Sequence, residues 1–276
     1  MEELIKIRNV KKKYGNKLIL NNININILKG QLLGIIGGNG IGKSTLLKII
    51  AGLTKISDGD VIWNKNYNNL KIRYVSDRFP KLKFTSYEYL YYMATIEGLS
   101  RTYINERLKF LFDIFDINSM KDILIKNLSK GTIQKISIMQ SILIKPDVLL
   151  LDEPFSGEDN NSKEVFINIL EDLKSKGVTI ILICHEMNLI NKLADKIIKI
   201  ENGKVIPYIY NNKIYIEISF EIINKCDVSI TNNILGLKNV KQNNKIITIL
   251  VDEKYSDDAL LTILKAGYSV VKVIKK

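Results

Sequence analysis

A glycine-rich segment, GGNGIGKS, at residues 37–44 limits the possible folds more than any other part of the sequence. Residues 31–36 before it form a short apolar run without alternation, which is typical of a strand buried on both faces. In residues 44–51 after it, apolar side chains repeat at helical spacing. A strand, a loop of this pattern and a helix in this order predict a phosphate-binding loop in a parallel α/β sheet.

The glycines of this loop allow backbone amides to surround phosphate oxygens, and the start of the following helix adds roughly half a positive charge. Lys43 is placed to reach the terminal phosphates, and the Ser44 hydroxyl is a candidate ligand of Mg²⁺. A chance glycine turn is the structural alternative, and the motif alone does not separate a kinase, a GTPase and an ATPase. The candidate nucleotide-binding residues are Gly37, Gly38, Asn39, Gly40, Ile41, Gly42, Lys43, Ser44 and Thr45.

Two carboxylates end a second buried strand. Residues 147–151 read DVLLL, and Asp152 and Glu153 follow directly. Because the carboxyl ends of parallel strands lie at the edge where the phosphate loop opens, we predict that Asp152 holds Mg²⁺. Glu153 is then predicted to orient or deprotonate the attacking water. A helix cap or a surface pair is the alternative interpretation.

The only histidine, His185, follows the apolar run of residues 178–184. A single histidine beside a core strand is usually structural. Here it stands at the carboxyl end of the strand, where the phosphates are expected to lie. We therefore predict that His185 contacts the γ-phosphate of the nucleotide.

Strands and helices alternate along the first 205 residues, as in a doubly wound α/β domain. Strict alternation of asparagine and isoleucine at 22–27 predicts a strand exposed on one face, in an additional antiparallel sheet. Residues 86–127 repeat apolar side chains at helical spacing and predict an inserted helical lobe. The rest of the chain predicts a small α+β unit with elements at 214–223, 246–251, 256–264 and 269–274.

A second candidate anion site begins at residue 128, in the sequence LSKGTIQK. Ser129 is predicted to cap a helix whose apolar face includes Ile133 and Ile136. An exposed helix N-terminus attracts anions. Because the chain already has one phosphate loop, this helix best serves a nucleotide bound by another subunit.

Together these motifs resemble those of the ATP-binding subunits of ABC transporters. The phosphate loop, LSKGT in place of the LSGGQ signature, LLLDEP, a D-loop-like segment at 156–159 and His185 occur in family order within residues 1–205. The resemblance implies a P-loop NTPase core with an antiparallel β subdomain and a helical subdomain at about 78–135. An accessory α+β domain at 206–276 would follow.

The same resemblance implies ATP and Mg²⁺ as ligands and two ATP molecules enclosed by a head-to-tail homodimer. It implies that Tyr14 stacks on adenine and that Asp159 links the two sites. The signature would act on the γ-phosphate held by the opposite subunit, mainly through Ser129 and Gly131. The four signature residues are Ser129, Lys130, Gly131 and Thr132.

Several residues depart from the family pattern. Asp77 stands where a glutamine usually senses Mg²⁺ and the attacking water, so it is a further candidate metal ligand that brings negative charge. Lys130 and Thr132 replace glycine and glutamine in the signature, and Glu158 replaces a leucine of the D-loop. None of these changes removes a phosphate-contacting group, so ATP hydrolysis is still expected.

Aromatic side chains crowd residues 79–92. Half of them fit the core of the helical lobe. The exposed remainder, with Phe79 and Phe84, is predicted to form a groove for a short helix of a membrane subunit. The set comprises Phe79, Phe84, Tyr87, Tyr89, Tyr91 and Tyr92.

We expect a cytoplasmic subunit, peripheral on the inner face of the cell membrane, that powers a separate integral membrane permease. No apolar run reaches the ~18 residues of a membrane helix, and the acidic start is unlike a secretory signal. An ATPase chain that is separate from its permease and carries a small C-terminal unit resembles the subunits of bacterial exporters of drugs, peptides or antibiotics. By this analogy, export is favoured over import.

Two other functions are considered. A net charge of +12 suits a soluble ABC-type ATPase that acts on ribosomes or nucleic acid. The chain has a single cassette, with neither long heptads nor a basic arm, so nucleic acid is not the expected partner. A P-loop kinase for small molecules would need an acceptor pocket and has no use for the segment at 129–131.

Overall fold

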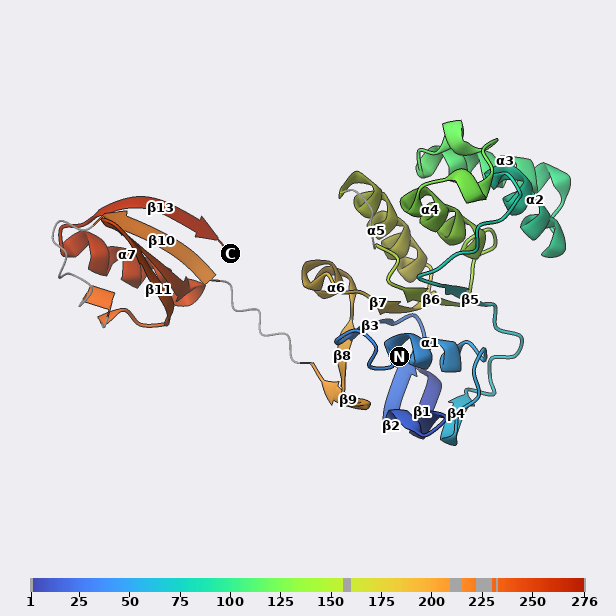
Figure 1. Cartoon of the computed structure of the whole chain (residues 1–276), viewed down its shortest axis with the longest axis horizontal. Coiled ribbons are helices and arrows are strands. Elements are labelled where there is room, and N and C mark those ends of the chain that lie inside the picture. The colour runs from blue at the N-terminus through green and yellow to red at the C-terminus, as the bar shows by residue number, and fades with distance from the viewer. Residues whose placement is uncertain (1, 156–159, 209–214, 222–229, 232, 276) are drawn as a thin grey trace. The chain divides into compact units, whose positions relative to one another are not determined.

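The computed structural model describes residues 2–155, 160–208, 215–221, 230–231 and 233–275. The chain divides into two compact units, Met1–Ile209 and Tyr210–Lys276 (Figure 1). The first unit has two apolar clusters and the second has a core of its own. Among the described residues, no helix is both long enough and apolar enough to cross a bilayer.

A six-stranded sheet forms the centre of the first unit (Figure 1). Its first five strands in spatial order are parallel, and the last is antiparallel to its neighbour. All residues of β3, β6 and β7 are buried, which confirms the prediction of strands covered on both faces. The strands, in spatial order, are β5 (Ile72–Val75), β6 (Val148–Asp152), β7 (Thr179–Ile183), β3 (Leu32–Ile36), β8 (Lys196–Glu201) and β9 (Lys204–Pro207).

Helices cover both faces of this sheet. Along β6, Val148 and Leu150 belong to the apolar cluster that contains α1 (Lys43–Ile50), whereas Leu149 and Leu151 belong to the other cluster. Within the first unit, Figure 1 shows α1 on one side of the sheet and the other helices of that unit on the opposite side. The helices of that opposite side include α4 (Lys130–Ser141), α5 (Asn160–Ser175) and α6 (Met187–Leu193).

A separate three-stranded antiparallel sheet has the order β2-β1-β4. The alternation predicted for residues 22–27 is confirmed in β2 (Lys17–Leu28), where Ile23, Ile25 and Ile27 are buried while Asn24 and Asn26 are exposed. The hairpin between β1 (Glu3–Tyr14) and β2 turns at Gly15, whose φ is +55°. The third strand is β4 (Asp58–Trp63).

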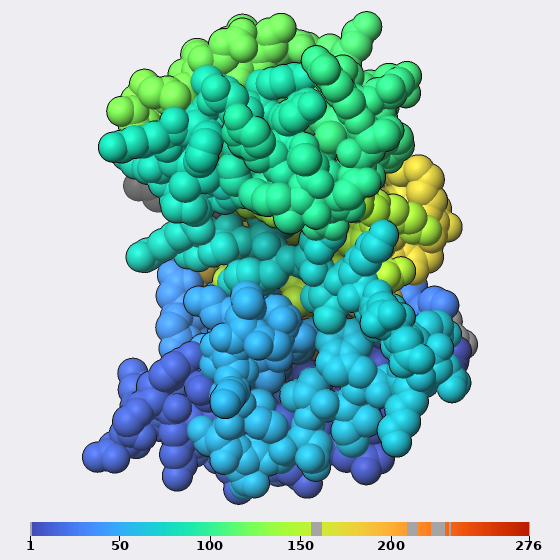
Figure 2. Space-filling model, turned by 90° about the vertical axis from the view of Figure 1, so that its right-hand side faces the viewer, coloured from blue at the N-terminus to red at the C-terminus, as the bar shows by residue number. Residues whose placement is uncertain are grey.

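The helical lobe contains α2 (Ser86–Ile96), α3 (Arg101–Ile114), two short 3₁₀ helices and α4. Thr85 and Glu88 form a reciprocal capping box that fixes the start of α2. In Figure 2 the lobe is seen in teal and green above the blue N-terminal part of the unit. The 3₁₀ helices are Asn118–Met120 and Ile125–Asn127.

The second unit is a four-stranded antiparallel sheet, in the order β11-β12-β10-β13, with α7 packed against it. Ile218, Phe220 and Ile249 of the sheet and Ile263 of α7 are fully buried in its core. The sequence predicted all of these elements except β11. The bounds are β10 (Tyr215–Glu221), β11 (Leu237–Asn243), β12 (Ile246–Asp252), α7 (Ser256–Lys265) and β13 (Ser269–Lys275), with a 3₁₀ turn at Glu253–Tyr255.

Candidate functional site

The glycine-rich loop lies between β3 and α1, as its sequence predicts. Two of its glycines have a backbone conformation and a packing that exclude side chains. Gly42 has a φ of +107°, and a Cβ there would come within 2.7 Å of the Leu20 side chain. A Cβ on Gly37 would come within 2.5 Å of the Ile200 carbonyl oxygen. The loop therefore needs glycine here to keep its amides open to a ligand.

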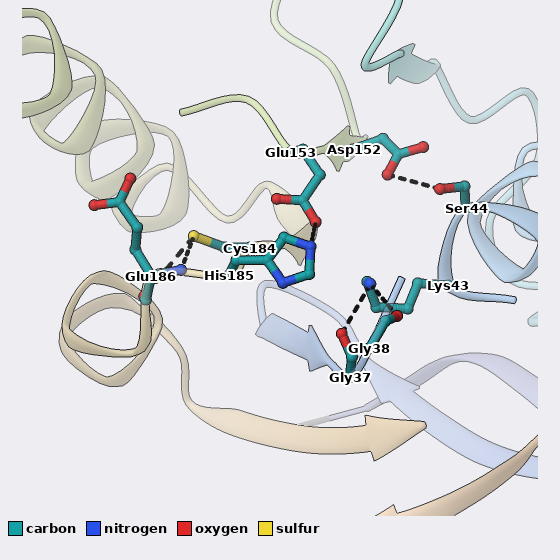
Figure 3. A network of polar contacts seen from close by, with 9 residues as sticks. All are labelled: Gly37, Gly38, Lys43, Ser44, Asp152, Glu153, Cys184, His185 and Glu186. Atoms are coloured by element: carbon teal, nitrogen blue, oxygen red, sulfur yellow. Dashed lines mark hydrogen bonds and ion pairs between the residues drawn. The ribbon is translucent and has the colours of Figure 1, made fainter. Parts of the chain in front are cut away.

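Lys43 is buried in the loop that precedes it. Its Nζ donates hydrogen bonds to the carbonyl oxygens of Gly37, at 2.9 Å, and Gly38, at 2.8 Å (Figure 3). Burial lowers the pKa of Lys43, while Glu153 and Asp152 oppose that shift. The ammonium is thus desolvated in advance and held where phosphate oxygens can replace two neutral carbonyls as stronger partners.

Asp152 is held from two sides at the end of β6. Its side chain is almost fully buried, and Oδ1 accepts a 3.0 Å hydrogen bond from the Ser44 hydroxyl of α1. Oδ2 accepts a 3.1 Å hydrogen bond from the Tyr74 hydroxyl of β5. Burial raises the pKa of Asp152, and the bonds from Ser44 and Tyr74 counteract the shift. The structure brings together Asp152 and Ser44, two of the three predicted magnesium ligands.

Glu153 and His185 point toward one another from the ends of neighbouring parallel strands (Figure 3). Glu153 Oε1 lies 2.7 Å from His185 Nε2, within ion-pair distance but without the orientation of a directed hydrogen bond. Glu153 has a φ of +53°, which is uncommon for a residue with a side chain, and its amide donates to the Ile183 carbonyl. Such left-handed residues cluster at functional sites.

The surroundings of Glu153 shift its acidity. Burial raises its pKa, the charges of His185 and Lys43 lower it, and the nearby Asp152 raises it. A base with a raised pKa holds a proton more firmly, so it is better matched to accept one from water near neutral pH.

The oxygen donors at this edge fit Mg²⁺. Ser44 Oγ and Asp152 Oδ1 face each other, and the carboxylate is buried next to a phosphate loop. Mg²⁺ typically takes one or two protein oxygens and completes its shell with water and substrate phosphates. Within the part of the chain that the structure describes, no three acidic, histidine or cysteine residues cluster in a way that could hold a metal ion.

Two other candidate residues lie where they remain accessible. Tyr14 ends β1, and 50% of its surface is exposed, with Lys12 Nζ 4.7 Å from the ring centroid. Its exposed ring can stack on a planar base. Asp77, the candidate metal ligand after β5, is an exposed residue that accepts a 3.4 Å hydrogen bond from Ser76 and lies 3.8 Å from Arg78. Asp159 lies outside the described residues.

The signature segment forms the start of α4. As predicted, Ser129 is the N-cap, and its Oγ accepts a 3.1 Å hydrogen bond from the amide of Thr132. Ser129 and Lys130 are exposed, while Gly131 and Thr132 are half-buried. Because α4 and α1 belong to opposite faces of the sheet, the signature helix and the phosphate-loop helix of one chain are separated by that sheet (Figure 1).

The structure also reveals contacts that the sequence did not predict. Tyr74 donates to Asp152 from a neighbouring strand, and Lys163 of α5 forms a 2.7 Å ion pair with Glu186 directly after His185. The Tyr74 contact depends on the register between β5 and β6, and the Lys163–Glu186 pair depends on the packing of α5 beside the start of α6. The alternation of side chains along a strand was the only available signal for Tyr74, and it does not give the register.

Comparison with known proteins places this geometry in a family. Residues 20–156 match the family model described as ABC transporter. The zinc import ATP-binding protein ZnuC of Rickettsia conorii is 33% identical over 206 residues, covering 73% of this chain and 84% of that protein. The lantibiotic transport ATP-binding protein SrtF of Streptococcus pyogenes is 34% identical over 209 residues, covering 74% and 89%.

Solved structures agree. A dimeric, post-hydrolysis ATP-binding cassette bound to ADP and Pi superposes with a TM-score of 0.65 at 25% identity, covering 73% of this chain and 96% of that one. The predicted fold class, a P-loop ATPase core of the ABC type, is therefore confirmed. The chain belongs to the ABC transporter family, as an ATP-binding, ATP-hydrolysing subunit.

Proposed function

We propose that this chain binds ATP with Mg²⁺ and hydrolyses it to drive a separate membrane permease. The observation that carries the proposal is the convergence of three groups at one edge of the sheet. These groups are the buried Lys43 ammonium, the Ser44–Asp152 oxygen pair and the Glu153–His185 pair. They supply a phosphate contact, a metal contact and a base, the three functions that hydrolysis of a γ-phosphate requires.

Each side chain has a distinct role in this proposal. Lys43 exchanges the carbonyls of Gly37 and Gly38 for β- and γ-phosphate oxygens. Glu153 orients the attacking water and accepts its proton. His185 fixes the Glu153 carboxylate and contacts the γ-phosphate. When bound through Ser44 and Asp152, Mg²⁺ offsets negative charge on the phosphates.

Two copies of the chain are needed to complete the site. The exposed N-terminus of α4, with Ser129 and Gly131, is proposed to contact ATP held by the phosphate loop of a second copy. Its support is the position of α4 across the sheet from α1. ATP would bridge two subunits through its γ-phosphate, whereas ADP would not. That difference in affinity shifts the dimer between closed and open states.

The permease is proposed to dock on an exposed apolar surface formed by α2 and by Phe84 just before it. Phe84 and Tyr92 are 46% and 51% exposed and pack edge to face, with ring centroids 5.9 Å apart, and Ile96 is 76% exposed one turn beyond. Phe79, which the sequence also assigns to this surface, is partly buried against the lobe core, and its ring packs edge to face on Tyr89 with centroids 5.4 Å apart. Aromatic side chains grouped in this way are favoured at the centre of protein interfaces.

A copurification experiment tests this docking surface. We expect Tyr92→Asp and Ile96→Asp to abolish copurification with a membrane permease coexpressed with this chain, while ATP binding remains. Lys109→Asp, at an exposed position on α3, is the matched control. Undiminished copurification of the α2 variants would contradict the assignment.

Export of a drug, peptide or antibiotic from the cytoplasmic side is the proposed direction. It is supported by the similarity to SrtF, whose name describes lantibiotic transport, although ZnuC is named for import. The unit at 210–276 is proposed to be an accessory domain of the transporter. Efflux of a labelled lantibiotic from cells, dependent on Glu153, tests the direction, and ATP-dependent uptake of a substrate would contradict it.

A further inference from the structure

The hydroxyl of Tyr74 lies beside the proposed magnesium site, and the proposed function gives it no role. Tyr74 lies on β5, the edge strand of the parallel sheet, and its ring packs in the apolar cluster on the α1 face. Its hydroxyl donates a 3.1 Å hydrogen bond to Asp152 Oδ2. Packing in this cluster requires only the aromatic ring of Tyr74. It does not explain why the hydroxyl is directed at a buried carboxylate.

The register of the sheet explains how Tyr74 reaches this carboxylate. Tyr74 pairs with Leu150 of β6, and Asp152 lies two residues further along the same strand. Side chains two residues apart point to the same face, so Tyr74, Leu150 and Asp152 all face α1. Such a diagonal neighbour is within reach of a long aromatic side chain but not of a short one.

The two hydrogen bonds to Asp152 come from different elements. Ser44 holds Oδ1 from α1, and Tyr74 holds Oδ2 from β5. The terminal torsion of an aspartate is broad, so a single hydrogen bond leaves the carboxylate free to turn. A second donor on the other oxygen removes that freedom. Residues that hydrogen-bond a metal-binding carboxylate, without touching the metal themselves, orient that carboxylate.

We propose that Tyr74 is a positioning residue that holds Asp152 so that Oδ1 stays beside Ser44, ready to bind Mg²⁺. The inference rests on the proposed function, because it takes Ser44 and Asp152 as the metal ligands. The hydroxyl of Tyr74 does not touch the metal or the nucleotide in this account. Its removal should therefore weaken metal binding without changing the metal-free affinity for nucleotide.

Electron paramagnetic resonance with Mn²⁺ in place of Mg²⁺ tests this inference on the full chain. Mn²⁺ is titrated into each variant in the presence of a non-hydrolysable ATP analogue, and the signal of free Mn²⁺ is followed. Tyr74→Phe keeps the ring and removes only the hydroxyl. We expect the Mn²⁺ affinity of this variant to fall about tenfold. Affinity for the analogue in EDTA should stay at the level of the unmodified chain.

The matched control is Tyr87→Phe. Tyr87 is also partly buried and donates a 3.2 Å hydrogen bond to Asn105, but it lies in the helical lobe. It loses the same chemical group, so a purely structural role for Tyr74 predicts equal Mn²⁺ affinity in the two variants. That result, or an unchanged Mn²⁺ affinity of Tyr74→Phe, would overturn the inference.

Asp152→Asn separates this inference from the proposed function. If Asp152→Asn weakens Mn²⁺ binding and Tyr74→Phe does not, the magnesium site stands and only the role of Tyr74 is wrong. If Asp152→Asn also binds Mn²⁺ as tightly as the unmodified chain, the assignment of the metal ligands is wrong, and the role of Tyr74 falls with it.

Discussion

At the scale of single residues, Lys43 is the side chain expected to contribute most to the affinity for a triphosphate. It is buried and its charge is balanced only at a distance, by Asp152 and Glu153. We predict that Lys43→Ala loses at least one charge-assisted hydrogen bond of about 2 kcal/mol, so the Kd for ATP rises more than tenfold. Fluorescent nucleotide titration measures this, with the exposed Lys192→Ala as control. Equal affinities would contradict the assignment.

Glu153→Gln should separate binding from hydrolysis. Glutamine keeps the size of the side chain but cannot accept the proton of water, so the hydrolysis rate should fall by about 10²–10⁴. ATP should still bind, and the dimer should remain closed around it. Single-turnover hydrolysis and size-exclusion chromatography with ATP check the two halves of this prediction. Hydrolysis at the unmodified rate would mean that another group is the base.

The raised pKa of Glu153 predicts a pH dependence. The base must be deprotonated to act, and its pKa lies above the ordinary value of 4.5 because of burial. The single-turnover rate should therefore fall, as the pH is lowered, at a pH above the range of an exposed glutamate. His185→Ala removes a group that lowers this pKa. In that variant the loss of rate on the acidic side of the pH–rate profile should therefore occur at still higher pH. A single-turnover rate that falls only at or below pH 4.5, in protein that is still folded, would contradict a raised pKa for Glu153.

At the scale of elements, the sequence predicted the buried strands and the capped start of α4 because their signals are local. Uninterrupted apolar runs mark β3, β6 and β7, and Ser129 precedes a helical repeat. It missed β11, in which Leu237 and Val240 are partly buried among exposed lysine and asparagine residues at the edge of the sheet. Such an edge strand has no continuous apolar face to read.

The site was predictable to the extent that it depends on strand ends. Asp152, Glu153 and His185 follow buried strands, so their meeting at one edge follows from parallel pairing. The Tyr74 contact depends on which residue of β5 pairs with which residue of β6, and the left-handed backbone of Glu153 depends on tertiary packing. Neither leaves a pattern in the sequence.

The start of α4 allows a complementation test of the shared site. Ser129→Asp keeps an N-capping side chain but sets a negative charge against phosphate. Alone, it should be as inactive as Lys43→Ala. A mixture of the two variants should regain hydrolysis, because mixed dimers contain one site with an intact Lys43 and an intact Ser129. Ser129→Asn, a neutral cap, should stay active. A mixture no more active than its components would contradict the shared site.

At the scale of the whole molecule, the chain carries its nucleotide chemistry in the first unit. The groups of the candidate site and the 20–156 match to the family model lie there, and the second unit has a separate core. Within that first unit the signature helix and the phosphate loop belong to opposite faces of the sheet. One protomer is therefore expected to supply only half of each working site.

The most direct test is the ATPase rate per protomer as a function of protein concentration. In the proposed mechanism neither site is complete until two chains meet, so the rate per protomer should rise with concentration and level off once the dimer forms. Analytical ultracentrifugation with ATP, over the same range, should show pairing at the same concentrations. A rate per protomer that stays constant down to dilutions where only monomers are present would contradict the account.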